Sequence, residues 1–81
     1  MTLEEIIEKT NLIFIEEFEV DEDELSADAI LRDALELDSL DYVDLVVAIE
    51  SSFSVKLVAE DFKSVDTLQS FYDLLATKIN G

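Results

Sequence analysis

The sequence predicts an all-α fold, a small antiparallel four-helix bundle with three main helices, one short helix and a long first loop. Three observations support this prediction. The 81 residues include one Gly and no Pro, so the chain has few of the residues that a turn-rich β fold needs. Hydrophobic residues make up 49% of the chain, and they recur at helical spacing in three segments. The length suits one compact domain, which we assign to residues 1–81.

The first predicted helix extends from about residue 3 to about residue 16. Thr2 followed three residues later by Glu5 has the form of a capping box, which marks the start of a helix. The apolar face then follows the i, i+3, i+4 spacing. It consists of Leu3, Ile6, Ile7, Thr10, Ile13 and Phe14.

Residues 17–37, EFEVDEDELSADAILRDALEL, are predicted to form the long first loop. The segment begins with acidic, irregular sequence, and a turn or two of helix is expected only around Ile30, Leu31, Ala34 and Leu35. A connection of this length is unusual inside a small domain and is often functional. We expect its apolar side chains to pack under the bundle.

Asp38 is a good N-cap for the next helix, which should extend to about Phe53. Asp41 lies in its first turn, where the helix dipole favours negative charge. A short helical piece is expected at residues 59–63, with Phe62 as its anchor.

Asp66 is predicted to cap the last helix, with Gln69 completing a second capping box. The apolar face of this helix consists of Leu68, Phe71, Tyr72, Leu75 and Ile79. Asn80 and Gly81 end it.

The helix at residues 39–53 has more apolar residues than one buried face requires. On a helical wheel they form two groups. The group expected to be buried is Tyr42, Leu45, Val46, Ile49 and Phe53, and the group on the opposite side is Leu40, Val43 and Val47. Asp41, Asp44 and Glu50 flank the second group. An apolar strip edged by carboxylates is typical of a docking surface. The alternative is that these three residues pack under the long loop.

The formal net charge of −16 restricts the partners. Such a charge repels nucleic acid and anionic lipid, and it attracts basic protein surfaces. We therefore expect no nucleic-acid partner, no stable membrane insertion and a monomer. The N-terminal residues show no secretory signal, so we expect a cytoplasmic protein.

The absence of Cys and His excludes most catalytic and metal chemistry. Ser39 has no general base near it, so it is a poor nucleophile, and we expect neither an enzyme nor catalytic residues. An EF-hand starting at Asp21 would need Gly at residue 26 and Glu at residue 32, where the chain has Ser26 and Arg32, so we expect no dedicated metal site. As a modification site Ser39 is better placed. A phosphodiester there would lie near free backbone N–H groups at the helix start.

The run Asp38-Ser39-Leu40-Asp41 and the residues after it, as far as Phe53, resemble the acyl carrier proteins of fatty acid and polyketide synthesis. The similarity extends over nearly the whole chain. In that family the serine of Asp-Ser-Leu is esterified by 4′-phosphopantetheine from coenzyme A, and acyl groups are carried as thioesters on the terminal thiol. The resemblance therefore implies that Ser39 is the attachment site.

The resemblance also implies which surface partner enzymes recognise: Asp38, Leu40, Asp41, Val43, Asp44, Val47 and Glu50. The implied partners have basic docking surfaces: a phosphopantetheinyl transferase (holo-carrier synthase), a ketosynthase, an acyltransferase and other acyl-processing enzymes. A cavity between the helices, lined by Phe14, Val46, Ile49 and Phe62, is expected to hold a short acyl chain.

The chain departs from the common family pattern at four positions: Glu36, Leu37, Tyr42 and Val58. The family often has Gly at the position of Glu36 and Pro at the position of Val58. A general fatty acid carrier and a carrier dedicated to one pathway both stay open. The alternative function is an acidic helical interaction module without a prosthetic group.

Overall fold

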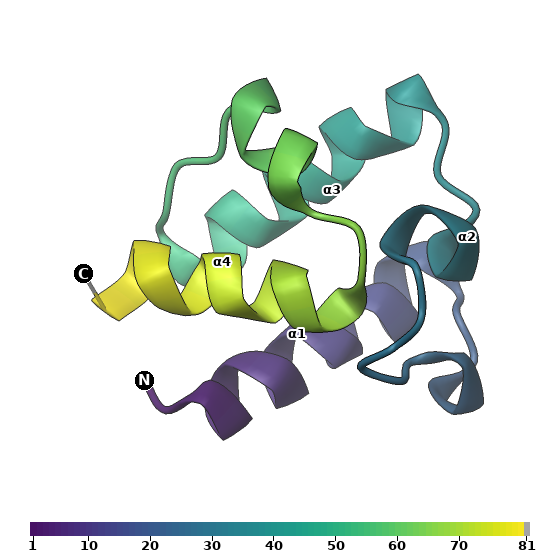
Figure 1. Ribbon diagram of the computed structural model, residues 1–81, viewed down its shortest axis with the longest axis horizontal. Helices are drawn as coiled ribbons and strands as arrows, with labels where there is room; N and C mark the ends of the chain where they lie inside the picture. The colour runs from purple at the N-terminus through teal and green to yellow at the C-terminus, as the bar shows by residue number, and fades with distance from the viewer. Residues whose placement is uncertain (81) are drawn as a thin grey trace.

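Three long helices enclose the core of the protein, and a computed structural model describes residues 1–80 except the side chains of Ser39 and Ala59. α1 runs antiparallel to both α3 and α4 (Figure 1). The elements in chain order are α1 Leu3–Phe18, η1 Glu22–Glu24, α2 Leu31–Leu35, α3 Ser39–Phe53, η2 Ala59–Ser64 and α4 Leu68–Asn80. The predicted all-α bundle is confirmed. Gly81, predicted to end the last helix, lies outside the described residues.

α1 begins as the sequence predicts. The Glu5 N–H donates to Thr2 Oγ1 at 3.2 Å, and the Thr2 N–H donates to Glu5 Oε1 at 3.0 Å, which completes the capping box. The helix extends two residues beyond the predicted end, to Phe18, whose half-buried ring packs against the core. Glu19 then adopts the left-handed conformation, φ 54°, and ends the helix.

The long loop is more ordered than its acidic sequence indicates. It contains a 3₁₀ turn, η1, that was not predicted. It also contains the short helix α2, at the place where a turn or two of helix was expected. Val20, Leu31, Leu35 and Leu37 are buried as predicted, whereas Ile30 is 42% exposed. Backbone hydrogen bonds join the loop to the start of α4: the Leu31 N–H donates to the Asp66 carbonyl at 2.8 Å, and the Leu68 N–H donates to the Ala29 carbonyl at 2.9 Å.

The predicted cap of α4 is wrong by one residue. The helix starts at Leu68, and Thr67 Oγ1, rather than the Asp66 carboxylate, accepts from the N–H three residues on, that of Ser70, at 3.2 Å. Gln69 instead donates from Nε2 to Asp73 along the helix. The pairing of Ala29 with Leu68 fixes where the helix can begin, and no local sequence pattern shows this contact.

The core lies between α1, α3 and α4, with η2 along one side (Figure 1). The expected short helix at residues 59–63 is a 3₁₀ helix, and its Phe62 ring stacks on Phe71 at 6.0 Å between centroids. Phe71 stacks in turn on Phe14 at 6.0 Å. The predicted apolar face of α4 is confirmed: Leu68, Phe71, Tyr72 and Leu75 are buried. These ring contacts hold η2 against α4 and α1.

Candidate functional site: the start and outer face of α3

The first turn of α3 is held by two aspartates. Asp38 is the N-cap, and its Oδ1 accepts from the N–H groups of Leu40 and Asp41, both at 2.9 Å. Asp41 Oδ2 accepts from the Asp38 N–H at 3.2 Å, so the two side chains form a reciprocal capping box. The predicted N-cap and the predicted place of Asp41 are confirmed.

The same hydrogen bonds correct one expectation. Free backbone N–H groups were expected at the helix start, but those of Leu40 and Asp41 are occupied by the Asp38 carboxylate. A phosphate near this turn would therefore find these two donors in use, while the field of the helix dipole still favours its negative charge.

Ser39 is the first residue of α3, directly after the N-cap. The orientation of its side chain, the predicted attachment point, lies outside the described part of the structure. The flanking residues Asp38 and Leu40 are exposed, Leu40 to 75%. The residues on either side of position 39 are therefore open to solvent.

The two faces of α3 are confirmed. Leu45 and Ile49 on the inner face are 0% exposed, and Tyr42, Val46 and Phe53 pack half-buried against the core. On the outer face Leu40, Val43 and Val47 are 75%, 60% and 57% exposed. Because these three side chains are exposed, the alternative that they pack under the long loop is wrong. The buried residues of the loop lie inside the fold instead.

The carboxylates beside the outer face differ in their local contacts. Asp44 is exposed, whereas Asp41 is half-buried and belongs to the capping box. Glu50 is also half-buried, and its Oε2 accepts from the Leu57 N–H at 2.9 Å. Glu50 therefore orders the connection from α3 to η2, a role that spacing on the helix did not reveal.

Three of the departures from the family pattern have structural explanations. Glu36 has φ 53° and ends α2 in the left-handed conformation, where Gly would be less strained. The Val58 N–H donates to Asp61 Oδ2 at 3.0 Å, a bond that Pro could not make. The ring of Tyr42 meets Phe62 edge-on at 5.4 Å, so its bulk fills the space between α3 and η2.

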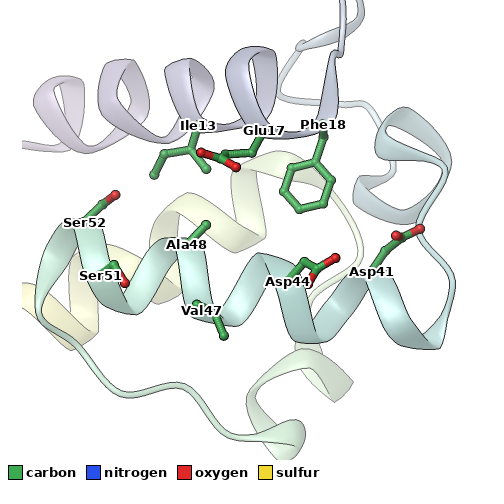
Figure 2. A pocket seen from close by; sticks show the side chains of 9 residues that line it. All are labelled: Ile13, Glu17, Phe18, Asp41, Asp44, Val47, Ala48, Ser51 and Ser52. Atoms are coloured by element: carbon green, nitrogen blue, oxygen red, sulfur yellow. The ribbon is translucent and has the colours of Figure 1, made fainter.

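A groove of about 650 Å³ lies between α1 and α3. Figure 2 shows that Ile13, Glu17 and Phe18 reach it from α1, facing Ala48 and Asp44 on α3. The residues expected to line an acyl cavity, Phe14, Val46, Ile49 and Phe62, do not line this groove. The groove was not predicted, because Glu17 and Phe18, which line it, lie beyond residue 16, the predicted end of the first helix.

Within residues 1–80, no helix is long and apolar enough to cross a membrane. The described side chains also include no group of three or more acidic residues placed to hold a metal ion.

Comparisons with known proteins confirm the resemblance. A family model described as "Phosphopantetheine attachment site" matches residues 12–75. The acyl carrier protein of Petrotoga mobilis is 40% identical over 80 residues, which cover 99% of this chain and 94% of the relative. Those of Thermotoga maritima and Guillardia theta are 38% and 34% identical, covering 94% and 98% of each chain. The chain belongs to the acyl carrier protein family: it bears a 4′-phosphopantetheine arm and carries acyl groups rather than catalysing a reaction.

Proposed function

We propose that Ser39 is the residue that bears the 4′-phosphopantetheine arm and that the outer face of α3 is the surface to which acyl-processing enzymes dock. The observation that carries this proposal is the position of Ser39. It is the first residue of α3, between a rigid capping box and an exposed apolar stripe. An arm attached there leaves the domain beside the surface that a partner would cover.

The local chemistry fits an arm that is tethered and otherwise free. The N–H groups of Leu40 and Asp41 already donate to Asp38, so they do not hold the phosphodiester. The arm supplies a terminal thiol for thioester formation, a group that the chain lacks because it has no Cys. A loosely held arm can reach several active sites in turn.

The partners of an acyl carrier protein include a phosphopantetheinyl transferase and acyl-processing enzymes. For this chain we propose a ketosynthase and an acyltransferase with basic docking surfaces. The proposed contact residues are Asp38, Leu40, Asp41, Val43, Asp44, Val47 and Glu50. A net charge of −16 supports docking to basic surfaces and opposes contact between two copies.

We further propose a cytoplasmic, monomeric carrier in which residues 1–81 form one domain. The radius of gyration of 11.4 Å supports a single domain, because about 12 Å is expected for a compact chain of this length.

The attachment site is tested by intact-mass measurement after incubation with coenzyme A and a broad-specificity phosphopantetheinyl transferase. Transfer forms a bond between the serine oxygen and the phosphorus next to pantetheine. It breaks a P–O bond of the pyrophosphate of coenzyme A and releases adenosine 3′,5′-bisphosphate and the hydroxyl proton. We expect a gain of one phosphopantetheine unit in the native chain and in Ser26→Ala, a matched change at an exposed serine outside the groove. Ser39→Ala should show no gain. A gain in Ser39→Ala would place the arm elsewhere, and failure of the folded native chain with its own transferase would favour an interaction module without a prosthetic group.

The docking surface is tested by the rate of loading of an Asp44→Lys variant. The sequence alone suggests reversing the charge of both Asp44 and Glu50, but Glu50 also accepts from the Leu57 N–H. Glu50→Gln keeps an oxygen acceptor for this bond and removes only the charge. We expect Asp44→Lys to lower kcat/KM about 5-fold at low salt. A Glu16→Lys variant makes the same kind of charge change at an exposed position of α1 and should lower kcat/KM less than about 2-fold. An equal loss of kcat/KM in both variants would mean that the effect comes from the net charge and not from the position of Asp44.

A further inference from the structure

The groove between α1 and α3 has features that the outer face of α3 does not explain. Its lining is mixed, with apolar side chains from both helices and polar groups along its edges. From α1 come Ile13, Glu17 and Phe18, and from α3 come Asp41, Asp44, Val47, Ala48, Ser51 and Ser52. Asp44 and Val47 belong to both surfaces, so the groove continues the outer face of α3 toward α1.

The carboxylates of the groove are unevenly placed along it. Figure 2 shows Asp41 and Asp44 toward the start of α3, Glu17 above Ala48 about midway along the groove, and Ser51 and Ser52 toward the other end. At the serine end, Lys9 Nζ donates to the Ser52 carbonyl at 3.1 Å. The ion pair recorded among the described residues joins Lys78 and Asp61, so it neutralises none of the groove carboxylates.

This combination selects one class of occupant. An apolar floor beside carboxylates fits a side chain with an apolar stem and a cationic head, such as Arg or Lys. The net charge of −16 opposes a second copy of the chain, nucleic acid and anionic membranes. A partner protein with a basic, amphipathic surface is the occupant that both the charge and the apolar floor favour.

The dimensions favour a helix. The lining residues of α3 span residues 41–52, a length of about 16 Å or three helical turns. A helix in a groove places anchors at i, i+4 and i+7, which covers a comparable length. We propose that the groove between α1 and α3 receives a basic amphipathic helix of a partner enzyme, with Arg or Lys side chains beside Glu17, Asp41 and Asp44. This inference rests on the proposed carrier function and extends the docking surface to α1.

The test uses a peptide of known composition. The probe is an amphipathic helix of about 18 Leu and Lys residues, which is long enough to be helical when bound. Its control has Glu in place of every Lys. Each is titrated at low salt into ¹⁵N-labelled chain carrying Ser39→Ala, so the arm plays no part and failure here leaves the attachment experiment unaffected.

We expect the Lys peptide to shift the amide signals of Ile13, Glu17, Phe18, Ala48 and Ser51, and the Glu peptide to shift none. The matched variants are Glu17→Lys and Glu16→Lys, which make the same charge change at exposed neighbouring positions, inside and outside the groove. Glu17→Lys should raise the Kd about 5-fold, and Glu16→Lys less than about 2-fold.

Three results would overturn the inference. The first is an equal rise in Kd for Glu16→Lys and Glu17→Lys. The second is a set of shifts confined to Leu40 and Val43 on the outer face of α3. The third is a shift of the groove signals with the concentration of the protein alone, which would make a second copy the occupant. Circular dichroism of both variants checks that each remains folded.

Discussion

The inner and outer faces of α3 contain similar residues in opposite surroundings. Leu45 on the inner face is 0% exposed, whereas Leu40 on the outer face is 75% exposed. The inner face packs into the core, whereas Leu40, Val43 and Val47 of the outer face are exposed. The comparison teaches that one helix can hold the fold together with one side and keep apolar side chains available for partners on the other. Stability and docking should therefore respond to different substitutions.

The largest effect should come from the same substitution made on each face. Leu45→Ala leaves a cavity in the core and should cost about 3 kcal/mol of unfolding free energy. Leu40→Ala removes an exposed side chain and should cost less than about 0.5 kcal/mol. Urea unfolding followed by circular dichroism measures both. Comparable losses would mean that Leu40 is also part of the core, and the distinction between the faces would fail.

The next effect concerns Asp38, which serves the fold and the proposed docking surface together. Asp38→Ala removes the acceptor of two N–H groups and should cost about 1 kcal/mol of stability. Asp38→Asn keeps an oxygen acceptor and should change stability by less than about 0.5 kcal/mol. Loading by the transferase should nevertheless slow in Asp38→Asn, because the charge is lost. If Asp38→Asn loads at the native rate, Asp38 acts through capping alone.

A smaller, favourable effect is expected at Glu36, which belongs to neither face of α3. Its φ of 53° is strained for a residue with a Cβ atom. Glu36→Gly should raise the unfolding free energy by about 0.5–1 kcal/mol. Glu36→Ala keeps the Cβ atom and should give no gain, so it separates strain from charge. A gain in both variants would show that relief of charge repulsion, rather than backbone strain, is responsible.

The smallest effect should come from Asp61 in η2. The bond from the Val58 N–H, followed by that from Lys78, holds the pKa of Asp61 below its ordinary value of 3.8. Because the folded pKa is lowered, the stabilisation is present above pH 3.8 and is lost as the pH falls through the folded pKa. Asp61→Asn should lower the urea midpoint slightly at neutral pH. The difference from the native chain should disappear once the native carboxylate is protonated, and a difference that persists would assign the effect to packing.

The features predicted correctly from sequence are those determined within a few residues. The capping box at Thr2, the N-cap at Asp38 and the two faces of α3 follow from side-chain chemistry and the 3.6-residue period. The family resemblance added the arm, which no periodicity could reveal. These predictions needed no knowledge of what lies beside each helix.

The features that sequence could not supply depend on contacts between distant segments. The cap of α4 is set by Thr67 because Ala29 pairs with Leu68 across the loop. The Glu50 carboxylate turns to the Leu57 N–H, and Phe18 extends α1 to complete the groove with α3. The left-handed conformation of Glu36 could not be predicted either, because it depends on α2 ending at this residue.

The placement of the two tyrosines has a practical consequence. The chain has no Trp and two Tyr, so its ultraviolet emission comes from Tyr42 and Tyr72. Tyr42 lies edge-on to Phe62 of η2, whereas the buried Tyr72 donates its hydroxyl hydrogen to Asn11 of α1. A Tyr72→Phe variant would leave Tyr42 as a single intrinsic fluorophore beside the candidate site. The emission of Tyr42 would then report on the contact between α3 and η2, with no added label.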